Sequence, residues 1–279
     1  MDGLFSVVRR KNFVLFLQKV FLGAMALWVL VPFIPLFLWS FTQSWFWPNL
    51  LPNIWGIRAW RYSFAPYSKV LEAIWTTILL SLFVTFLNII ICLLPAKVLG
   101  QKKFRGKEFI RLFLLSPLIV PPIAVALGIL SIFIRLGLSN TFIGVAIAHL
   151  IPTMPYMTMM LSAVFENFDI DFEEQARSLG AGPIKTFFYV TLPVIMPGII
   201  AGSLFTFLVS FNEFVFTFLV GGGKVITLSV LLFNFMGGEA GYDFPITAAL
   251  AIIMSIPGII FLIVTERAIK EEFFTLGFK

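Results

Sequence analysis

Long apolar stretches separated by short polar ones dominate the pattern of this 279-residue chain. Six of these stretches reach the roughly 20 residues that a helix needs to cross a lipid bilayer. They are residues 20–41, 70–94, 109–133, 141–165, 194–220 and 248–264. We therefore expect an all-α membrane protein with six transmembrane helices, in a single transmembrane domain that covers residues 1–279.

The composition agrees with this prediction. Hydrophobic residues make up 59% of the chain and charged residues only 12%, whereas soluble domains carry about 25% charged residues. The net charge is +6, but the basic residues lie beside the apolar stretches and not on one soluble face. The charge therefore indicates membrane topology, and we expect no nucleic-acid partner.

Lysine and arginine predict the orientation. With six crossings, the N-terminus, residues 95–108, residues 166–193 and the C-terminus share one side, and this side holds 15 of the 20 basic residues. Because basic residues concentrate on the cytoplasmic side, we expect both termini in the cytoplasm and the chain in the plasma or inner membrane. Six of the seven tryptophans flank the first external loop, which is typical of an interfacial aromatic belt or of a surface that binds an external protein.

The third, fourth and sixth predicted spans contain prolines that suggest broken or bent helices. A proline inside a helix removes a backbone hydrogen bond and bends or breaks the helix. Broken or bent helices suit a transport pathway that changes shape. The prolines concerned are Pro117, Pro121 and Pro122 in the third span, Pro152 and Pro155 in the fourth, and Pro257 in the sixth.

The loop at residues 166–193 contains a predicted amphipathic helix. Asp171 lies three residues before Glu174, which is the spacing of a capping box, and Glu173 and Glu174 lie at the positive end of the helix dipole. One apolar face is expected from the periodic residues Phe172, Ala176 and Leu179.

Glycines and prolines punctuate the rest of this loop. Gly180 occupies the place of a left-handed residue after the helix, and Pro183 suits the first turn of a second helix. Pro193 and Pro197 are expected to break that second helix. Two short helices joined by a tight elbow would form a small surface that fits a groove on a partner.

The same residues resemble a known motif. Glu174-Gln175-Ala176, Gly180 and Val190-Thr191-Leu192-Pro193 resemble the EAA loop of permease subunits in binding-protein-dependent ABC importers. That motif is Glu-Ala-Ala, three residues, Gly, nine residues and Ile-x-Leu-Pro, so Gln175 and Val190 are the departures.

The resemblance implies a type I ABC importer permease fold with a cytoplasmic coupling helix. It implies that two ATPase subunits, which bind ATP and Mg, join this chain in the lipid bilayer with a second permease subunit, identical or homologous, and an extracytoplasmic solute-binding protein. The coupling residues that it implies are Glu173, Glu174, Gln175, Ala176, Gly180, Leu192 and Pro193.

No catalytic or metal-binding constellation is visible in the sequence. The glycine-rich stretch at residues 221–227 does not match a phosphate loop, which has a glycine five residues before its Gly-Lys pair and a Ser or Thr after it. Phe218 stands at the place of that first glycine, and Val225 follows Lys224. His149 has no second histidine, and we interpret it as a packing residue with satisfied hydrogen bonds, with a proton or substrate contact as the alternative. We expect a non-catalytic subunit that binds no cofactor or metal itself.

The fifth span carries the predicted translocation residues Asn212 and Glu213, flanked by Phe211 and Phe214. An ionisable residue inside a membrane is costly and rarely faces lipid. Glu213 is thus either a substrate or gate contact or a buried polar anchor. In the same span, Gly198-x-x-x-Gly202 permits close helix packing, either within the subunit or against the partner permease.

The substrate is open to two interpretations. The EAA segment resembles that of importers of polyamines, ferric iron and other small charged solutes, whereas "FNEF" and the "FTLGFK" tail resemble the sugar-importer branch. A carboxylate among aromatic rings suits a cationic solute or a sugar. We expect a polyamine-like or other small charged solute, with a carbohydrate importer as the alternative. A secondary transporter that works without ATP is a remote alternative. Such a transporter would favour several carboxylates inside the membrane or two inverted halves, whereas the sequence shows one membrane-embedded carboxylate, Glu213, and no obvious inverted repeat.

Overall fold

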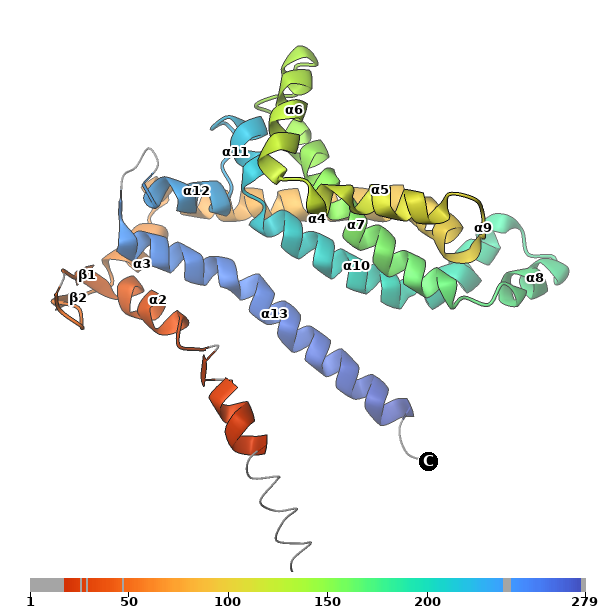
Figure 1. The fold of residues 1–279 in the computed structure, drawn as a ribbon, viewed down its shortest axis with the longest axis horizontal. Coiled ribbons are helices and arrows are strands. Elements are labelled where there is room, and N and C mark those ends of the chain that lie inside the picture. The colour runs from red at the N-terminus through yellow and green to blue at the C-terminus, as the bar shows by residue number, and fades with distance from the viewer. Residues whose placement is uncertain (1–17, 26, 29, 47, 238–241, 277–279) are drawn as a thin grey trace, which may run out of the picture. The chain divides into compact units, whose positions relative to one another are not determined.

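The computed structural model describes the backbone of residues 18–276, apart from residues 26, 29, 47 and 238–241, and side chains up to residue 263. The chain divides into two compact units (Figure 1). The first comprises residues up to Ala65 together with Phe235–Ile253, and the second comprises Pro66–Asn234 together with the residues from Met254 onward.

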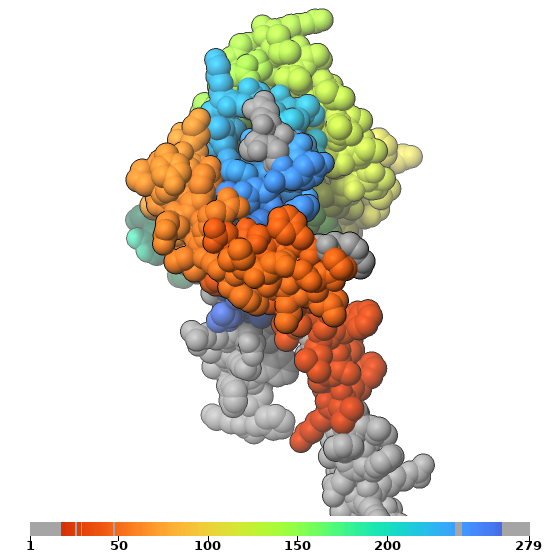
Figure 2. All heavy atoms as spheres, turned by 90° about the vertical axis from the view of Figure 1, so that its left-hand side faces the viewer, coloured from red at the N-terminus to blue at the C-terminus, as the bar shows by residue number. Residues whose placement is uncertain are grey.

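The first unit combines short helices with a small hairpin. Its elements are α2 (Phe33–Ser40), the antiparallel strands β1 (Thr42–Ser44) and β2 (Ile54–Trp55), and α3 (Arg58–Ser63). The hairpin and α3 form a continuous orange mass of side chains in Figure 2. The expectation of an all-α chain is therefore correct except for this pair of strands.

The first predicted span, residues 20–41, is not one continuous helix in its described part. A turn at Val31 and Pro32 precedes α2, because Pro32 has no amide hydrogen with which to continue a helix. Aromatic rings pack after this turn, with the ring centroids of Trp39 and Trp45 separated by 4.7 Å. The Arg58 guanidinium also pairs with the Asp243 carboxylate at 2.9 Å within this unit.

The second unit contains most of the long helices. In chain order, its elements are a 3-10 turn (Pro66–Ser68), α4 (Val70–Gln101), α5 (Lys107–Ile119), α6 (Pro122–Arg135), α7 (Phe142–Glu166), α8 (Asp171–Ser178), α9 (Pro183–Thr186), a π-helical turn (Phe187–Thr191), α10 (Leu192–Asn212), α11 (Val215–Gly221) and α12 (Leu228–Phe235). The last helix, α13 (Phe244–Leu276), begins in the first unit and continues into the second.

Four described helical segments are long and apolar enough to cross a membrane. They are Val70–Gln101, Phe142–Glu166, Pro183–Asn212 and Phe244–Ile263, and they overlap the second, fourth, fifth and sixth predicted spans. The fifth ends at Asn212, so the prediction that it extends to residue 220 is wrong. The third predicted span is a bent pair, α5 and α6, which meet at 96°. The described residues thus contain four such segments, or five if the bent pair is one span.

The bend between α5 and α6 confirms the proline prediction for the third span. Val120 and Pro121 separate the two helices, and Pro122 occupies the first turn of α6, where its missing amide hydrogen costs nothing. By contrast, Pro152 and Pro155 lie inside the unbroken α7, and Pro257 lies inside α13. The other prolines therefore do not break their helices.

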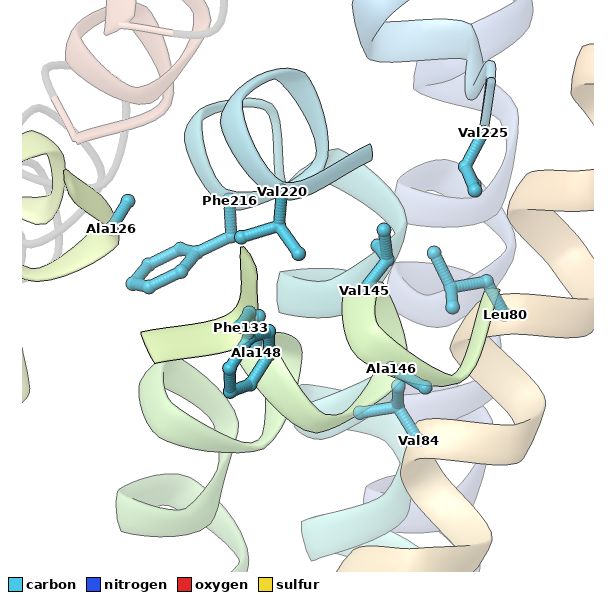
Figure 3. Close-up of a cluster of buried hydrophobic side chains, with 10 residues drawn as sticks. All are labelled: Leu80, Val84, Ala126, Phe133, Val145, Ala146, Ala148, Phe216, Val220 and Val225. Carbon is cyan, nitrogen blue, oxygen red and sulfur yellow. The ribbon is translucent and has the colours of Figure 1, made fainter. Parts of the chain in front are cut away.

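The centre of the second unit is formed by α4, α7 and α10, which lie side by side (Figure 1). One buried apolar cluster joins α4 and α7 to α6 and α11; Figure 3 shows its members Leu80, Val84, Ala126, Phe133, Val145, Ala146, Ala148, Phe216, Val220 and Val225. A second cluster joins the opposite ends of α4 and α7 to α10; its buried members are Cys92, Ala96, Met157, Leu161, Phe165, Phe168 and Ile195.

Glycines allow the closest helix contacts in this bundle. A Cβ atom on Gly198 would lie 2.7 Å from Val164 Cγ2, and one on Gly202 would lie 2.7 Å from Met157 Sδ. Both neighbours belong to α7, so the Gly198-x-x-x-Gly202 motif packs within the subunit. The sequence left this choice open, and the contact with α7 decides it.

Several buried polar side chains in the bundle are paired with one another. His149 is fully buried, and its Nδ1 and Nε2 atoms lie 2.9 Å from Ser210 Oγ and 2.7 Å from Thr217 Oγ1. Asn88 of α4 donates to Thr153 Oγ1 of α7 at 2.9 Å. The interpretation of His149 as a packing residue with satisfied hydrogen bonds is confirmed.

We expect Gly100→Ala to destabilise the bundle, because the added Cβ would lie 2.5 Å from Phe165 Cβ and 2.8 Å from the backbone oxygen of Ser162. Overpacking of this kind costs about 1–3 kcal/mol. Gly128→Ala is the matched control, since no atom of the described part of the chain lies within 4 Å of the corresponding Cβ in α6. Thermal unfolding of the purified protein should show a lower midpoint for Gly100→Ala alone; equal midpoints would contradict the close α4–α7 contact.

Candidate coupling loop and translocation site

The helix α8 begins at Asp171, the residue predicted to cap it, and is capped differently. The Asp169 carboxylate accepts a hydrogen bond from the Asp171 amide at 3.0 Å, whereas the N-cap residue Ile170 has no side chain that can accept one. The predicted capping box between Asp171 and Glu174 is therefore wrong. The first turn does contain three acidic residues, Asp171, Glu173 and Glu174, which favour the positive end of the helix dipole.

The elbow after α8 has the predicted backbone. Gly180 has a φ of 86°, which is the left-handed conformation that glycine adopts without strain. The Ala181 amide donates to the Ala176 oxygen at 3.0 Å and closes the helix end. Gly182 is extended and Pro183 occupies the first turn of α9, as expected.

The second part of the loop does not end at its prolines. After α9, a π-helical turn leads directly into α10, so that Pro183–Asn212 forms one long helical segment. Pro193 lies in the first turn of α10, and Pro197 lies inside that helix. The prediction that Pro193 and Pro197 break the helix is wrong, because the wider π turn adjusts the backbone ahead of Pro193.

Most of the predicted coupling residues lie on the surface. Glu174, Gln175, Gly180 and Pro193 are exposed, whereas Ala176 and Leu192 are half-buried. Most of the predicted apolar face of α8 is not covered by the described residues, since Phe172 is 50% exposed and Leu179 is 89% exposed. Ile184 of α9, which the sequence analysis did not single out, is 74% exposed beside the same elbow.

Glu173 differs from the other predicted coupling residues because it is buried, with 7% of its surface exposed. Its Oε1 atom accepts hydrogen bonds from Lys97 Nζ at 2.6 Å and from Thr191 Oγ1 at 2.7 Å. Arg177 lies 3.7 Å from Oε2, one helical turn along α8.

The surroundings of Glu173 favour its charged form. Burial opposes ionisation, but the hydrogen bonds from Lys97 and Thr191 and the two nearby positive charges outweigh it, so the pKa of Glu173 lies below its ordinary value. The sequence analysis missed Lys97 and Thr191 as partners. The available signal was the position of Lys97 at one end of a predicted span, among the basic residues that predict the orientation of the chain.

The predicted translocation residues lie where the fifth span breaks. Glu213 and Phe214 separate α10 from α11, and the half-buried Glu213 accepts a hydrogen bond from the Phe216 amide at 3.2 Å. Its backbone oxygen accepts hydrogen bonds from Ser229 Oγ at 2.8 Å and from Thr217 Oγ1 at 3.3 Å. The Glu213 side chain thus caps the start of α11, and its backbone oxygen connects the break between α10 and α11 to α12.

The neighbours of Glu213 have different environments. Asn212 is exposed and donates to the backbone oxygen of Leu208 at 2.9 Å, whereas Phe211 is buried. The ring of Phe214 lies 4.8 Å from that of Phe233 and 5.3 Å from that of Phe218, measured between centroids. The break therefore brings a carboxylate next to a cluster of three phenylalanine rings.

The described residues contain no group of three or more His, Cys, Asp or Glu side chains arranged to hold a metal ion. The only cysteine, Cys92, is buried and free.

Comparison with known proteins adds independent information. Residues 93–270 match the family described as "Binding-protein-dependent transport system inner membrane component". The putrescine transport system permease protein PotI of Escherichia coli is 30% identical over 164 residues, which cover 57% of this chain and 58% of that protein. This chain therefore spans somewhat more than half the length of PotI. The spermidine/putrescine transport system permease protein PotC of Haemophilus influenzae is 24% identical over 257 residues, which cover 92% of this chain and 98% of PotC.

A solved structure supports the fold. A chain in the crystal structure of a bacterial ABC transporter that imports the acidic polysaccharide alginate has a TM-score of 0.71 and 21% sequence identity. The match covers 93% of this chain and 97% of that one. This likeness shows the ABC importer permease fold. The chain belongs to the family of binding-protein-dependent transport system inner membrane components, the multi-pass, non-catalytic permeases of ABC importers.

Proposed function

We propose that this chain pairs with a second permease subunit, identical or homologous, to form the transmembrane pathway of an ABC importer. Two ATPase subunits bind ATP and Mg on the cytoplasmic side, and an extracytoplasmic solute-binding protein delivers the solute. Family membership supports ATPase and binding-protein partners in general. Fifteen of the 20 basic residues lie in or beside the segments predicted to share one side with the α8–α9 loop, which supports a cytoplasmic location for the loop and for both termini.

The observation that carries this proposal is the exposed apolar elbow between two membrane spans. Phe172, Leu179 and Ile184 present apolar side chains around Gly180, and none of them is covered within the described chain. An exposed apolar surface rimmed by polar residues is typical of a protein–protein contact. We therefore assign α8 as the coupling helix, with Glu174, Gln175, Ala176 and Gly180 facing an ATPase groove and Leu192 and Pro193 supporting the loop from α10.

We propose a polyamine or similar small cationic solute as the substrate. Both permeases compared above are named for putrescine or spermidine, and the identity to PotI reaches 30%. The half-buried Glu213 carboxylate beside the Phe214 ring also suits an ammonium group, which is attracted by charge and by the aromatic face. A carbohydrate is the second candidate, and the alginate importer supports it through fold alone.

Copurification tests this assembly. We expect the tagged chain, expressed with the genes adjacent to its own, to purify with two ATPase subunits and a second permease subunit. After reconstitution with the binding protein, uptake of radiolabelled putrescine or spermidine should require ATP. Stoichiometry is measured by native mass spectrometry. A preparation of this polypeptide alone that transports solute without ATP would contradict the assignment, and uptake of a sugar but not of a polyamine would decide for the second candidate.

A further inference from the structure

Glu173 bonds the coupling loop to the membrane helices. We propose that Glu173 and Lys97 act as a positioning pair that makes α8 and the cytoplasmic end of α4 move together. Displacement of α8 by an ATPase would then reach the membrane bundle directly. This inference rests on the proposed function, because it requires that α8 receives the movement.

The positioning pair lies away from the proposed docking surface. Glu173 is buried, whereas its neighbours Phe172 and Glu174 are exposed, so one side of α8 serves the chain itself and the other is open to a partner. In the described part of the chain, α8 packs mainly against α9 and the π-helical turn. The ion pair of Glu173 with Lys97 links α8 to α4, and its hydrogen bond with Thr191 links α8 to the start of α10.

Lys97 is set in a rigid part of the bundle. Its neighbour Ala96 is fully buried in the cluster that contains Leu161 and Phe165 of α7. One turn later, Gly100 allows α4 to approach Phe165 closely. Because close-packed interiors transmit displacement instead of absorbing it, movement of Lys97 would carry α4 and α7 with it.

The chemistry of the pair favours a contact that stays closed during the transport cycle. The Lys97 Nζ–Glu173 Oε1 distance of 2.6 Å is that of a strong, charge-assisted hydrogen bond. Glu173 is buried while Lys97 is half-buried, so removing Lys97 leaves a buried carboxylate without its closest cation, which is unfavourable. Thr191 satisfies the same carboxylate oxygen, and Arg177 neutralises the other one from the solvent side. Two of these contacts, with Lys97 and Thr191, come from outside α8, so the carboxylate connects movement of α8 to α4 and to the π-helical turn.

The test uses the complete complex, reconstituted with its binding protein in liposomes, and measures uptake per ATP hydrolysed. We expect Lys97→Met and Glu173→Gln to lower this ratio at least fivefold while the ATPase subunits stay bound. Lys97→Arg keeps the charge and the donors, so its ratio should stay within twofold of the unaltered complex. Lys103→Met is the matched control, because Lys103 is exposed just beyond the end of α4 and has no ion pair among the described residues.

Three other outcomes would contradict either the positioning role or the proposed function. Normal uptake per ATP in both Lys97→Met and Glu173→Gln would overturn the positioning role. Loss of assembly in both, with normal coupling in whatever complex survives, would also overturn it and leave a structural ion pair. The proposed function fails separately, if the unaltered chain does not bind ATPase subunits. In that case the copurification experiment is negative before any Lys97 variant is made.

Discussion

Gly180→Val is expected to leave the complex assembled in the membrane but to reduce solute uptake per ATP hydrolysed by about tenfold. Gly180 has a φ of 86°, and a side chain in this left-handed conformation costs about 1–2 kcal/mol. None of the described residues lies within 4 Å of the added Cβ, so the bundle itself has room for the change. The strain is confined to the elbow at Gly180, which either changes its backbone conformation or fits the ATPase groove less well. A difference of about 1.4 kcal/mol corresponds to a factor of ten.

Two further variants separate the causes of this effect. Gly137→Val introduces the same kind of strain, since Gly137 has a φ of 69° and open space around it, but it lies outside the coupling loop. We expect it to transport normally. Gly180→Asn tolerates the left-handed backbone while adding a side chain, so it reports steric fit to the ATPase. Normal uptake per ATP by purified Gly180→Val complex would show that the coupling assignment is wrong.

Glu213→Gln is expected to reduce uptake of a cationic solute by at least tenfold without loss of assembly. The carboxamide oxygen introduced by this substitution can still accept the hydrogen bond from the Phe216 amide, so the start of α11 should be kept. Only the negative charge is lost, and with it the attraction for an ammonium group beside the Phe214 ring. For a neutral sugar the loss should be much smaller, because the amide still bonds to hydroxyl groups.

Uptake normalised to assembled complex distinguishes the roles of Glu213. Glu213→Ala is the companion variant, because it removes both the charge and the acceptor that starts α11. If Glu213 is only a structural anchor, Glu213→Ala lowers the yield of complex, while both variants transport normally per surviving complex. That result would remove Glu213 from the translocation pathway. A selective loss of polyamine uptake in Glu213→Gln would instead support both the pathway role and the cationic substrate.

The sequence predicted the bends and turns that depend on single proline and glycine residues. Pro121 and Pro122 cannot both continue a helix, and α5 and α6 meet there at 96°. Gly180 follows the last periodic residue of an amphipathic helix and is left-handed, as the spacing indicates. Predictions that involved a longer stretch of chain were less accurate. The break of the fifth span at Glu213 lies inside an apolar run that continues to Val220, and hydrophobicity alone does not mark it.

The coupling loop shows the same division. The exposed elbow was predictable, because turn residues and helix periodicity act over a few positions. The role of Glu173 was not, since its partner Lys97 is 76 residues away in the chain. The resemblance groups Glu173 with the residues that face an ATPase, whereas its carboxylate is buried against α4 and the π-helical turn.

The membrane class, most of the spans and the coupling elbow follow from the amino-acid sequence, because apolar length, glycine and proline act locally. The pairing of the helices depends on the three-dimensional fold. The fifth span is apolar on all sides, so periodicity does not tell which face packs, and the approach of Gly198 and Gly202 to α7 follows from shape complementarity between distant segments. The partner of Glu173 also depends on the three-dimensional fold. A buried carboxylate is stabilised by the cation that the fold places beside it, and the order of charges along the chain does not identify that cation as Lys97.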